Sequence, residues 1–200
     1  MSLSIGWRAA AHAVHLPATA IPEEGMIRRL AAVTLLALAA CAPKAETPEQ
    51  MAARIKAESD TAKTALQADL NRFCRNWGAG QADSVAMFYA EDAVAMYPNE
   101  QAVKGRAAIL AELNKFLTYG QYQCSLTVTG VEANGPLAVA WYTYVENFKP
   151  GPHALPGMAA AFPDTGYSVT AFRKVNGQWL AFADIGVTSR AVPAPAAKKH

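Results

Sequence analysis

The chain has 200 residues, of which 52% are hydrophobic and 17% are charged. This length and composition suffice for one domain of ordinary size with appended segments. The chain has eighteen Lys and Arg residues and sixteen Asp and Glu residues, so the formal net charge at pH 7 is only +2. Such a balance offers no broad basic surface, and we expect no nucleic-acid partner.

The first feature in chain order is a predicted export signal. A short basic segment, residues 26–29, precedes the apolar run Leu30 to Ala40. This run is too short to span a bilayer but has the length of the hydrophobic region of a signal peptide. It ends in Leu38-Ala39-Ala40-Cys41, which resembles a bacterial lipobox. We therefore predict a lipoprotein signal peptide over residues 26–40, preceded by an over-extended or non-native start over residues 1–25.

In this interpretation Cys41 is the first mature residue and carries lipid. Acyl chains on Cys41 would attach the protein firmly to a membrane of the bacterial cell envelope. Ala42 follows the cysteine, where an aspartate marks inner-membrane retention in the lipoproteins that the segment resembles, so the periplasmic face of the outer membrane is favoured. The alternative is a buried N-terminal helix with an incidental cysteine. Residues 41–53 lack an apolar period and are interpreted as a linker.

Three helices are expected next. The first runs from about Arg54 to Trp77, because its apolar residues recur every three or four positions, and two glycines then end it. Asp83 is expected to cap a short second helix that continues through Tyr89. A strand over residues 93–97 follows, and Gly105 precedes a third amphipathic helix.

Four longer strands follow, because apolar and polar residues alternate or run together between turn signals. They are expected over residues 122–132, 137–148, 167–175 and 178–188. Asn176-Gly177 is a strong signal for a hairpin between the last two. The second strand is apolar on both faces, so one face is expected to pack on helices and the other on a dimer partner. Residues 149–166 are a long insertion, either a lid or a surface loop, and residues 190–200 are a predicted disordered tail.

Helices followed by a meander of strands predict an α+β fold in which three N-terminal helices pack in a curved, mostly antiparallel sheet. Four motifs add a family resemblance, to the SnoaL-like branch of the nuclear transport factor 2-like superfamily, over residues 54–189. The motifs are Gly80-Gln81-Ala82-Asp83, Tyr89-Ala90-Glu91-Asp92-Ala93-Val94, Gly105-Arg106-Ala107-Ala108-Ile109 and Lys174-Val175-Asn176-Gly177-Gln178-Trp179. The resemblance implies a cone-shaped roll with a pocket at its open end. It does not specify a reaction, since the superfamily holds isomerases, dehydratases, cyclases and non-catalytic binding domains.

Several kinds of chemistry are disfavoured by the residues present. After the predicted signal only His153 and His200 remain as imidazoles, so we expect no metal site. Glycine-rich phosphate or dinucleotide loops are missing from the sequence, and we expect no cofactor. Cys74 and Cys124 lie fifty residues apart. In an exported protein of this fold they can form a disulfide, the alternative being two buried free thiols.

The pocket implied by the resemblance would be lined mainly by aromatic side chains. The expected ligand-binding residues are Trp77, Tyr97, Phe116, Trp141, Tyr144 and Phe172. Few polar groups could act inside it: Tyr97, Tyr144, Glu146, Arg173, Asp184 and His153. In the ketosteroid isomerases that the sequence resembles, a carboxylate moves a proton while a tyrosine holds the developing oxyanion, and Asp184 with Tyr97 or Tyr144 could take these roles.

Two observations weigh against that assignment. Many SnoaL-like sequences carry two histidines on the closing strand, where this chain has Ala183 and Ile185. Strand alternation also places Asp184 opposite these two residues, so we expect its carboxylate to be exposed or to bond a turn. The favoured hypothesis is therefore a lipid-anchored homodimer that binds a small apolar or aromatic molecule without catalysis. The alternative is an isomerase, dehydratase or cyclase that uses Asp184 as general base.

Overall fold

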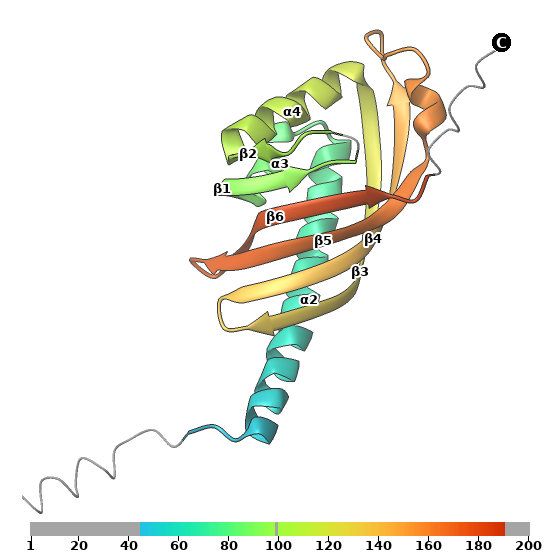
Figure 1. Ribbon diagram of the computed structural model, residues 1–200. Helices are drawn as coiled ribbons and strands as arrows, with labels where there is room; N and C mark the ends of the chain where they lie inside the picture. Colours follow the sequence, from blue (N-terminus) through green and yellow to red (C-terminus); the bar gives the residue numbers. More distant parts are fainter. Residues whose placement is uncertain (1–44, 99, 191–200) are drawn as a thin grey trace, which may run out of the picture. The chain divides into compact units, whose positions relative to one another are not determined.

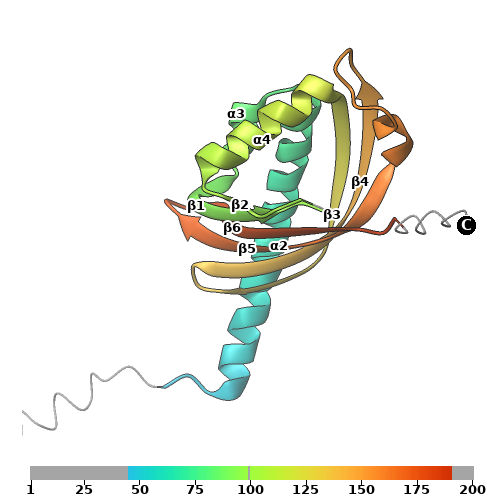
Figure 2. The ribbon, with the colours of Figure 1, turned by 45° about the horizontal axis from the view of Figure 1, so that its top comes forward.

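The computed structural model describes residues 45–98 and 100–190. They form helices packed against a curved six-stranded sheet with strand order β2-β1-β6-β5-β4-β3, as Figures 1 and 2 show. The elements are α2 (Pro48–Gly78), α3 (Ala82–Ala86), β1 (Tyr89–Met96), β2 (Val103–Lys104), α4 (Arg106–Tyr119), β3 (Gly120–Asn134), β4 (Leu137–Pro150), the 3-10 helix η1 (Met158–Ala161), β5 (Asp164–Val175) and β6 (Gln178–Thr188). The predicted α+β class and its curved, mostly antiparallel sheet are confirmed. The predicted signal peptide, Cys41 and residues 191–200 lie outside the described residues.

Helix α2 begins earlier than the predicted Arg54, because its first turns are stabilised locally rather than by burial. Thr47 is the N-cap and accepts a hydrogen bond from the backbone N–H of Gln50, whose side chain accepts one from the Thr47 N–H in return. Pro48 occupies the first helical position, where its missing N–H costs nothing. Residues 48–53 are therefore helical, and the prediction that they belong to a linker is wrong.

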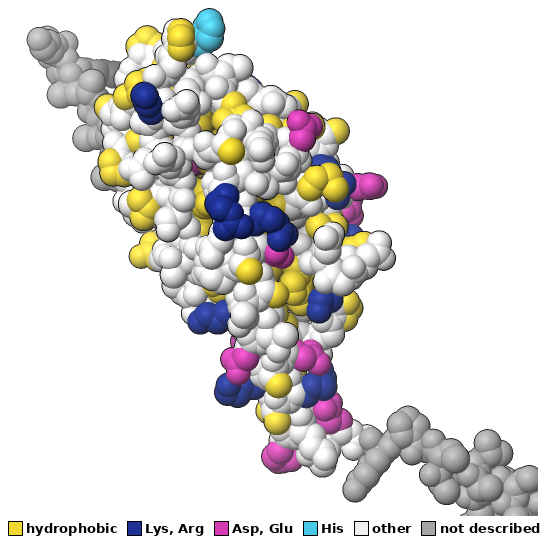
Figure 3. Space-filling model, turned by 180° about the vertical axis from the view of Figure 1, so that it is seen from behind, with side chains coloured by type: hydrophobic (Ala, Val, Ile, Leu, Met, Phe, Trp, Pro, Cys, Tyr) yellow, Lys and Arg dark blue, Asp and Glu magenta, His cyan; other side chains and the backbone are white. Residues whose placement is uncertain are grey.

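Charged side chains cover this first part of α2. Figure 3 shows acidic and basic groups close together at the lower end of the helix. Arg54 pairs with Glu46 and Glu58, and Lys56 pairs with Asp60. Exposed pairs of this kind contribute only a few tenths of a kcal/mol each, about 0.3–0.5 for neighbours four apart. In the described part of the chain, no helix is long and apolar enough to cross a membrane.

The segment after α2 differs from its prediction. Gln81 is the N-cap of α3, and Asp83 lies in the first turn instead of capping it. Tyr89 begins strand β1 instead of ending a helix, and β1 pairs in parallel with β6, with Tyr89 opposite Ala181. The Ala181 N–H donates to the Phe88 carbonyl, which fixes the start of this pairing. A partner strand so distant in the sequence gives no local signal, which is why β1 was predicted too short.

The long strands follow their predicted ranges closely. Strand β6 has the bounds predicted for it, and the hairpin at Asn176-Gly177 is present, with φ angles of 50° and 81°. Both residues take the left-handed conformation that a tight hairpin turn needs. The predicted insertion is shorter than expected because β4 continues to Pro150 and β5 begins at Asp164.

The core lies between α2, α4 and the inner face of the sheet. Its fully buried side chains include Leu66, Leu70, Ile109 and Phe172. Phe172 has no exposed surface and belongs to this core, so it does not line a cavity as predicted. A disulfide joins Cys74 on α2 to Cys124 on β3, with the Cα atoms 5.2 Å apart. It ties the helix to the strand that forms one wall of the cavity described next.

Candidate ligand-binding site

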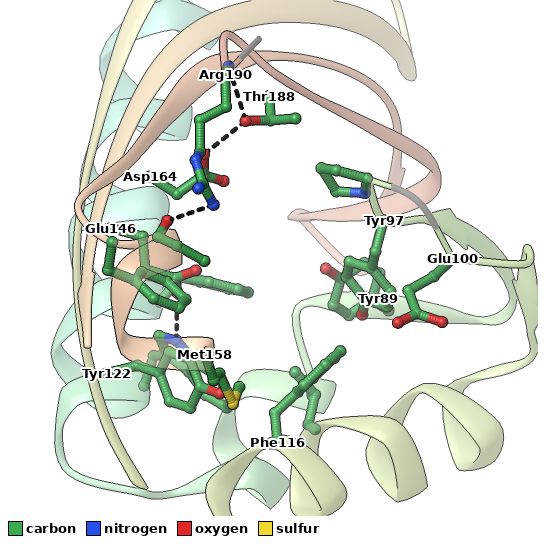
Figure 4. A pocket seen from close by; sticks show the side chains of 16 residues that line it. Tyr89, Tyr97, Glu100, Phe116, Tyr122, Glu146, Met158, Asp164, Thr188 and Arg190 are labelled. Carbon is green, nitrogen blue, oxygen red and sulfur yellow. Dashed lines mark hydrogen bonds between the residues drawn. The ribbon is translucent and has the colours of Figure 1, made fainter. Parts of the chain in front are cut away.

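A cavity of about 540 Å³ opens between the end of α2, α4 and the curved strands β3 to β6. Figure 4 shows its side chains converging from opposite walls, with Tyr89 and Tyr97 on one side and Glu146 and Asp164 on the other. Aromatic rings make up much of the lining: Phe73, Trp77, Tyr89, Tyr97, Phe116, Tyr122 and Phe162. The cavity is thus mainly apolar, with a few polar groups at fixed positions.

The aromatic wall is built by stacking between distant segments. Trp77 stacks on Tyr122 with the ring centres 5.1 Å apart, and Tyr122 packs against Phe148 at 4.9 Å. Phe148 in turn contacts Phe162 at 5.0 Å, so the segment between β4 and β5 is part of this wall. Pairs of this kind each contribute about 0.5–1.5 kcal/mol beyond the area they bury. The rings are therefore held in place before any ligand arrives.

Arg190 holds the same segment over the cavity. Its guanidinium donates to the carbonyls of Ala161 at 2.9 Å and Ala160 at 3.3 Å. Met158, Ala161 and Phe162, all from the predicted insertion, line the cavity. Part of the predicted insertion 149–166 therefore borders the pocket, which argues against a surface loop remote from it.

Glu146 is the main titratable group of the cavity. One carboxylate oxygen, Oε1, accepts a hydrogen bond from the Trp77 indole N–H at 2.8 Å. Among the described residues no side chain or backbone group donates to the other oxygen. Burial raises the pKa of Glu146 to about 7, the neighbouring Asp164 carboxylate adds to the rise, and the Trp77 hydrogen bond opposes it. Glu146 can therefore exchange a proton near neutral pH.

Asp164 lies beside Glu146, since the two residues are paired across strands β4 and β5. Its two oxygens accept hydrogen bonds from Tyr144 Oη at 2.9 Å and Thr188 Oγ1 at 2.6 Å. Thr188 also accepts a hydrogen bond from the backbone N–H of Arg190, as Figure 4 shows. Two carboxylates thus face the cavity from adjacent strands.

Two phenol groups of the lining have no partner. Within the described residues, the hydroxyls of Tyr97 and Tyr122 are buried and make no hydrogen bond. A buried polar group without a partner costs about 1–3 kcal/mol, so each of these hydroxyls would gain from a ligand atom. They come from different elements, Tyr97 following β1 and Tyr122 within β3.

A smaller recess of about 160 Å³ shares part of this lining, and Asp184 is among the residues that border it. The Asp184 carboxylate accepts hydrogen bonds from Thr170 Oγ1 at 2.7 Å, Tyr89 Oη at 2.9 Å and Tyr142 Oη at 3.4 Å. Burial raises the pKa of Asp184, and these three hydrogen bonds oppose the rise. The prediction of an exposed or turn-bonding Asp184 is wrong.

The reason is a β-bulge. Phe172 pairs with Ala181 and Ala171 with Ala183, so Phe182 is left as an extra residue on β6. The bulge reverses which residues face inward along the rest of the strand. Ile185 is consequently 41% exposed on the outer face, while Asp184 lies inside.

Comparison with known proteins assigns the family. The sequence profile of the SnoaL-like domain matches residues 70–183, which is more than half of the chain. The chain belongs to the SnoaL-like domain family. No curated protein sequence gives a significant match to it.

Solved structures share this SnoaL-like architecture at low sequence identity. A protein of unknown function from Mycobacterium tuberculosis is 17% identical with a TM-score of 0.54, over 64% of this chain and 72% of the other. An NTF2-like protein of unknown function from Pseudomonas putida KT2440 is 20% identical with a TM-score of 0.52, over 64% and 87%. A candidate scytalone dehydratase from Novosphingobium aromaticivorans is 14% identical with a TM-score of 0.53, over 65% and 85%. These similarities establish the fold and no activity.

Within the SnoaL-like domain, the residues predicted to bind a ligand are divided among four places, one of which is the core that holds Phe172. Trp77, Tyr97 and Phe116 line the main cavity, and Tyr144 lines the smaller recess together with Tyr97 and Asp184. Trp141 is 41% exposed on the outer face of the sheet, so its prediction as a cavity residue is wrong.

Other residues that line the SnoaL-like cavity are not among the predicted site residues, above all Glu146, Asp164 and Arg190. The sequence places Glu146 among the polar groups able to act inside the pocket but does not single it out as a site residue. Its spacing from Tyr142 and Tyr144, two residues apart along one strand, is a signal that it shares their inward face. In the described part of the chain no group of three potential metal ligands occurs.

Proposed function

We propose that the protein is a lipid-anchored member of the cell envelope whose SnoaL-like domain binds a small apolar or aromatic molecule without catalysis. The observation that carries this proposal is the cavity of about 540 Å³. Its volume lies in the usual range of small-molecule sites, and such sites are mostly apolar with a few placed polar groups. Trp77 and Tyr122, whose rings stack, and Phe162, which meets Tyr122 edge-on, supply aromatic surface for a planar ligand.

Native mass spectrometry of the purified chain, compared with the same sample denatured, tests the binding. We expect a small molecule that is present only under native conditions, or a rise in Tm with a panel of small aromatic compounds. Replacement of Phe116 by Ala should weaken such binding, whereas Val139→Ala on the outer face should not. An empty native spectrum together with an unchanged Tm across the panel would contradict the proposal.

The anchoring rests on the sequence motif that ends at Cys41. Radiolabelled palmitate fed to cells that express the full chain should label the wild type and not Cys41→Ala. Membrane fractionation gives a second readout, since the unlipidated chain should leave the membrane fraction. Labelling of the variant equal to that of the wild type would exclude lipid attachment at Cys41.

A homodimer through the sheet is part of the proposal. The outer face of β4, β5 and β6 exposes a cross-strand row in which Trp141 lies opposite Val169 and Val169 opposite Ile185. These three side chains are 41–47% exposed. Large exposed apolar patches of this kind mark interaction sites. A second copy that covers the row would remove it from water.

A second candidate function is an isomerase, dehydratase or cyclase, and Glu146 favours it. This carboxyl has a pKa of about 7, faces the cavity and retains a free oxygen among the described residues. Asp184 is a weaker candidate for the base, because both of its oxygens already accept hydrogen bonds from hydroxyl groups. Tyr97 could donate to a developing oxyanion.

The two assignments of the base are separated by parallel variants. On a substrate that is turned over, Glu146→Gln should lower kcat by about 10²–10⁴, the usual contribution of a general base. Asp184→Asn places an amide oxygen and an amide nitrogen where the two carboxylate oxygens lie, and it should retain most of the activity. The reverse result would return the role of base to Asp184.

A further inference from the structure

We infer that the molecule held in the main cavity carries a protonated amine on an aromatic body, with its ammonium group bound between Glu146 and Asp164. The inference rests on the proposed binding function and names the chemistry of its ligand. It is carried by the pairing of two carboxylates on adjacent strands directly beside the stacked rings of Trp77 and Tyr122.

The charges of the lining favour a cation. Three acids border the cavity, Glu100, Glu146 and Asp164, against one base, Arg190. Among the described residues none of these acids forms an ion pair with Arg190. The Arg190 guanidinium instead bonds the carbonyls of residues 160 and 161. Glu146 therefore keeps one oxygen available to a positive ligand, and Asp164, whose two oxygens each accept one hydrogen bond, lies beside it.

The hydrogen-bonding capacity of the site points the same way. The free oxygen of Glu146 can accept a hydrogen bond from N–H, and the buried phenol oxygen of Tyr122 on the same wall has no partner among the described residues. An ammonium group has three such donors and no acceptor. Charge-assisted hydrogen bonds to a carboxylate are stronger than those between neutral groups.

The aromatic walls complete the arrangement. Cations bind favourably over the faces of Trp and Tyr rings, most strongly where water is excluded. Trp77 is 5% exposed and Tyr122 is 3% exposed, so little of either ring is open to water. Trp77 also donates its indole N–H to Glu146, which fixes the carboxylate beside the ring. A carboxylate ligand in the same place would lie between two acidic groups, Glu146 and Asp164.

Three probes that share a phenyl ring test the inference by isothermal titration calorimetry on the full chain. They are 2-phenylethylamine, which is a cation at neutral pH, the neutral 2-phenylethanol and the anion phenylacetate. We expect the amine to bind at least tenfold more tightly than the alcohol, and phenylacetate to bind weakest. Glu146→Gln should reduce the affinity for the amine about tenfold and leave that for the alcohol unchanged. The exposed Glu132→Gln on β3 is the matched control and should change neither.

The outcomes separate the inference from the function on which it rests. Equal binding of the amine and the alcohol would overturn the cation preference and leave the binding of aromatic molecules in place. Preference for phenylacetate would also overturn it. A failure of all three probes to bind would count against both proposals. An unchanged amine affinity in Glu146→Gln would remove Glu146 from the site.

Discussion

The buried carboxyl of Glu146 makes the stability of the fold depend on pH in a predictable way. Its pKa is about 7 in the folded protein, compared with an ordinary value of 4.5. The folded state therefore binds this proton more tightly than the unfolded state. The contribution to the free energy of unfolding is fully present below about pH 4.5, falls as the pH rises toward 7, and is lost above that value.

The size of the effect follows from the two pKa values. Their difference corresponds to about 3 kcal/mol, since each pKa unit is worth about 1.4 kcal/mol. This is an upper limit, because water that reaches the cavity mouth screens a half-buried carboxylate. Replacement by Gln removes the charge and keeps an oxygen able to accept the Trp77 hydrogen bond. We therefore expect Glu146→Gln to be more stable than the wild type above pH 7.

Urea unfolding followed by circular dichroism from about pH 4.5 to about pH 8 measures this effect. The difference in free energy of unfolding between Glu146→Gln and the wild type should grow in favour of the variant across this range. Asp184 also has a raised pKa, but it is present in both proteins and its contribution cancels. Glu132→Gln should show no such change. Parallel curves for the wild type and Glu146→Gln would refute the burial of an ionisable carboxyl at this position.

Further predictions concern the disulfide, the smaller recess and the outer face of the sheet. Replacing both Cys74 and Cys124 by Ser opens a loop of fifty residues and should cost about 4 kcal/mol in urea unfolding; an unchanged midpoint would show that the bridge adds no stability. Asp184→Ala leaves three hydroxyls without their acceptor and should destabilise by more than about 3 kcal/mol, whereas Asp184→Asn should cost less. Val169→Asp should convert a dimer to monomer in sedimentation velocity with an unchanged circular dichroism spectrum, and a persisting dimer would place the interface elsewhere.

Much of the secondary structure could be predicted because its causes are local. The bounds of β6 and the turn at Asn176-Gly177 were predicted correctly, since two adjacent residues determine that turn. The start of α2 was missed because a capping box, rather than an apolar period, begins the helix at Pro48. A capping box is itself a sequence signal, and here Thr47 and Gln50 supply it.

The faces of the strands were harder to predict. Strand β4 is apolar on both sides around Trp141, so alternation alone does not tell which side faces the helices. Trp141 lies outside and Tyr142 inside because of the pairing with β3 and β5. On β6 the bulge at Phe182 changes which side chains face inward. A bulge depends on the partner strand rather than on the sequence of its own strand.

The sequence by itself determined the family, the α+β class and the aromatic character of the pocket, because these depend on residue types and on their spacing along one segment. Only the tertiary structure decided that Glu146 lies between Trp77 and Asp164, and that Asp184 is buried beneath Tyr89. These neighbours are separated by 18 to 95 residues in the chain. Their approach depends on the register of the sheet and on the packing of α2, which no single segment encodes.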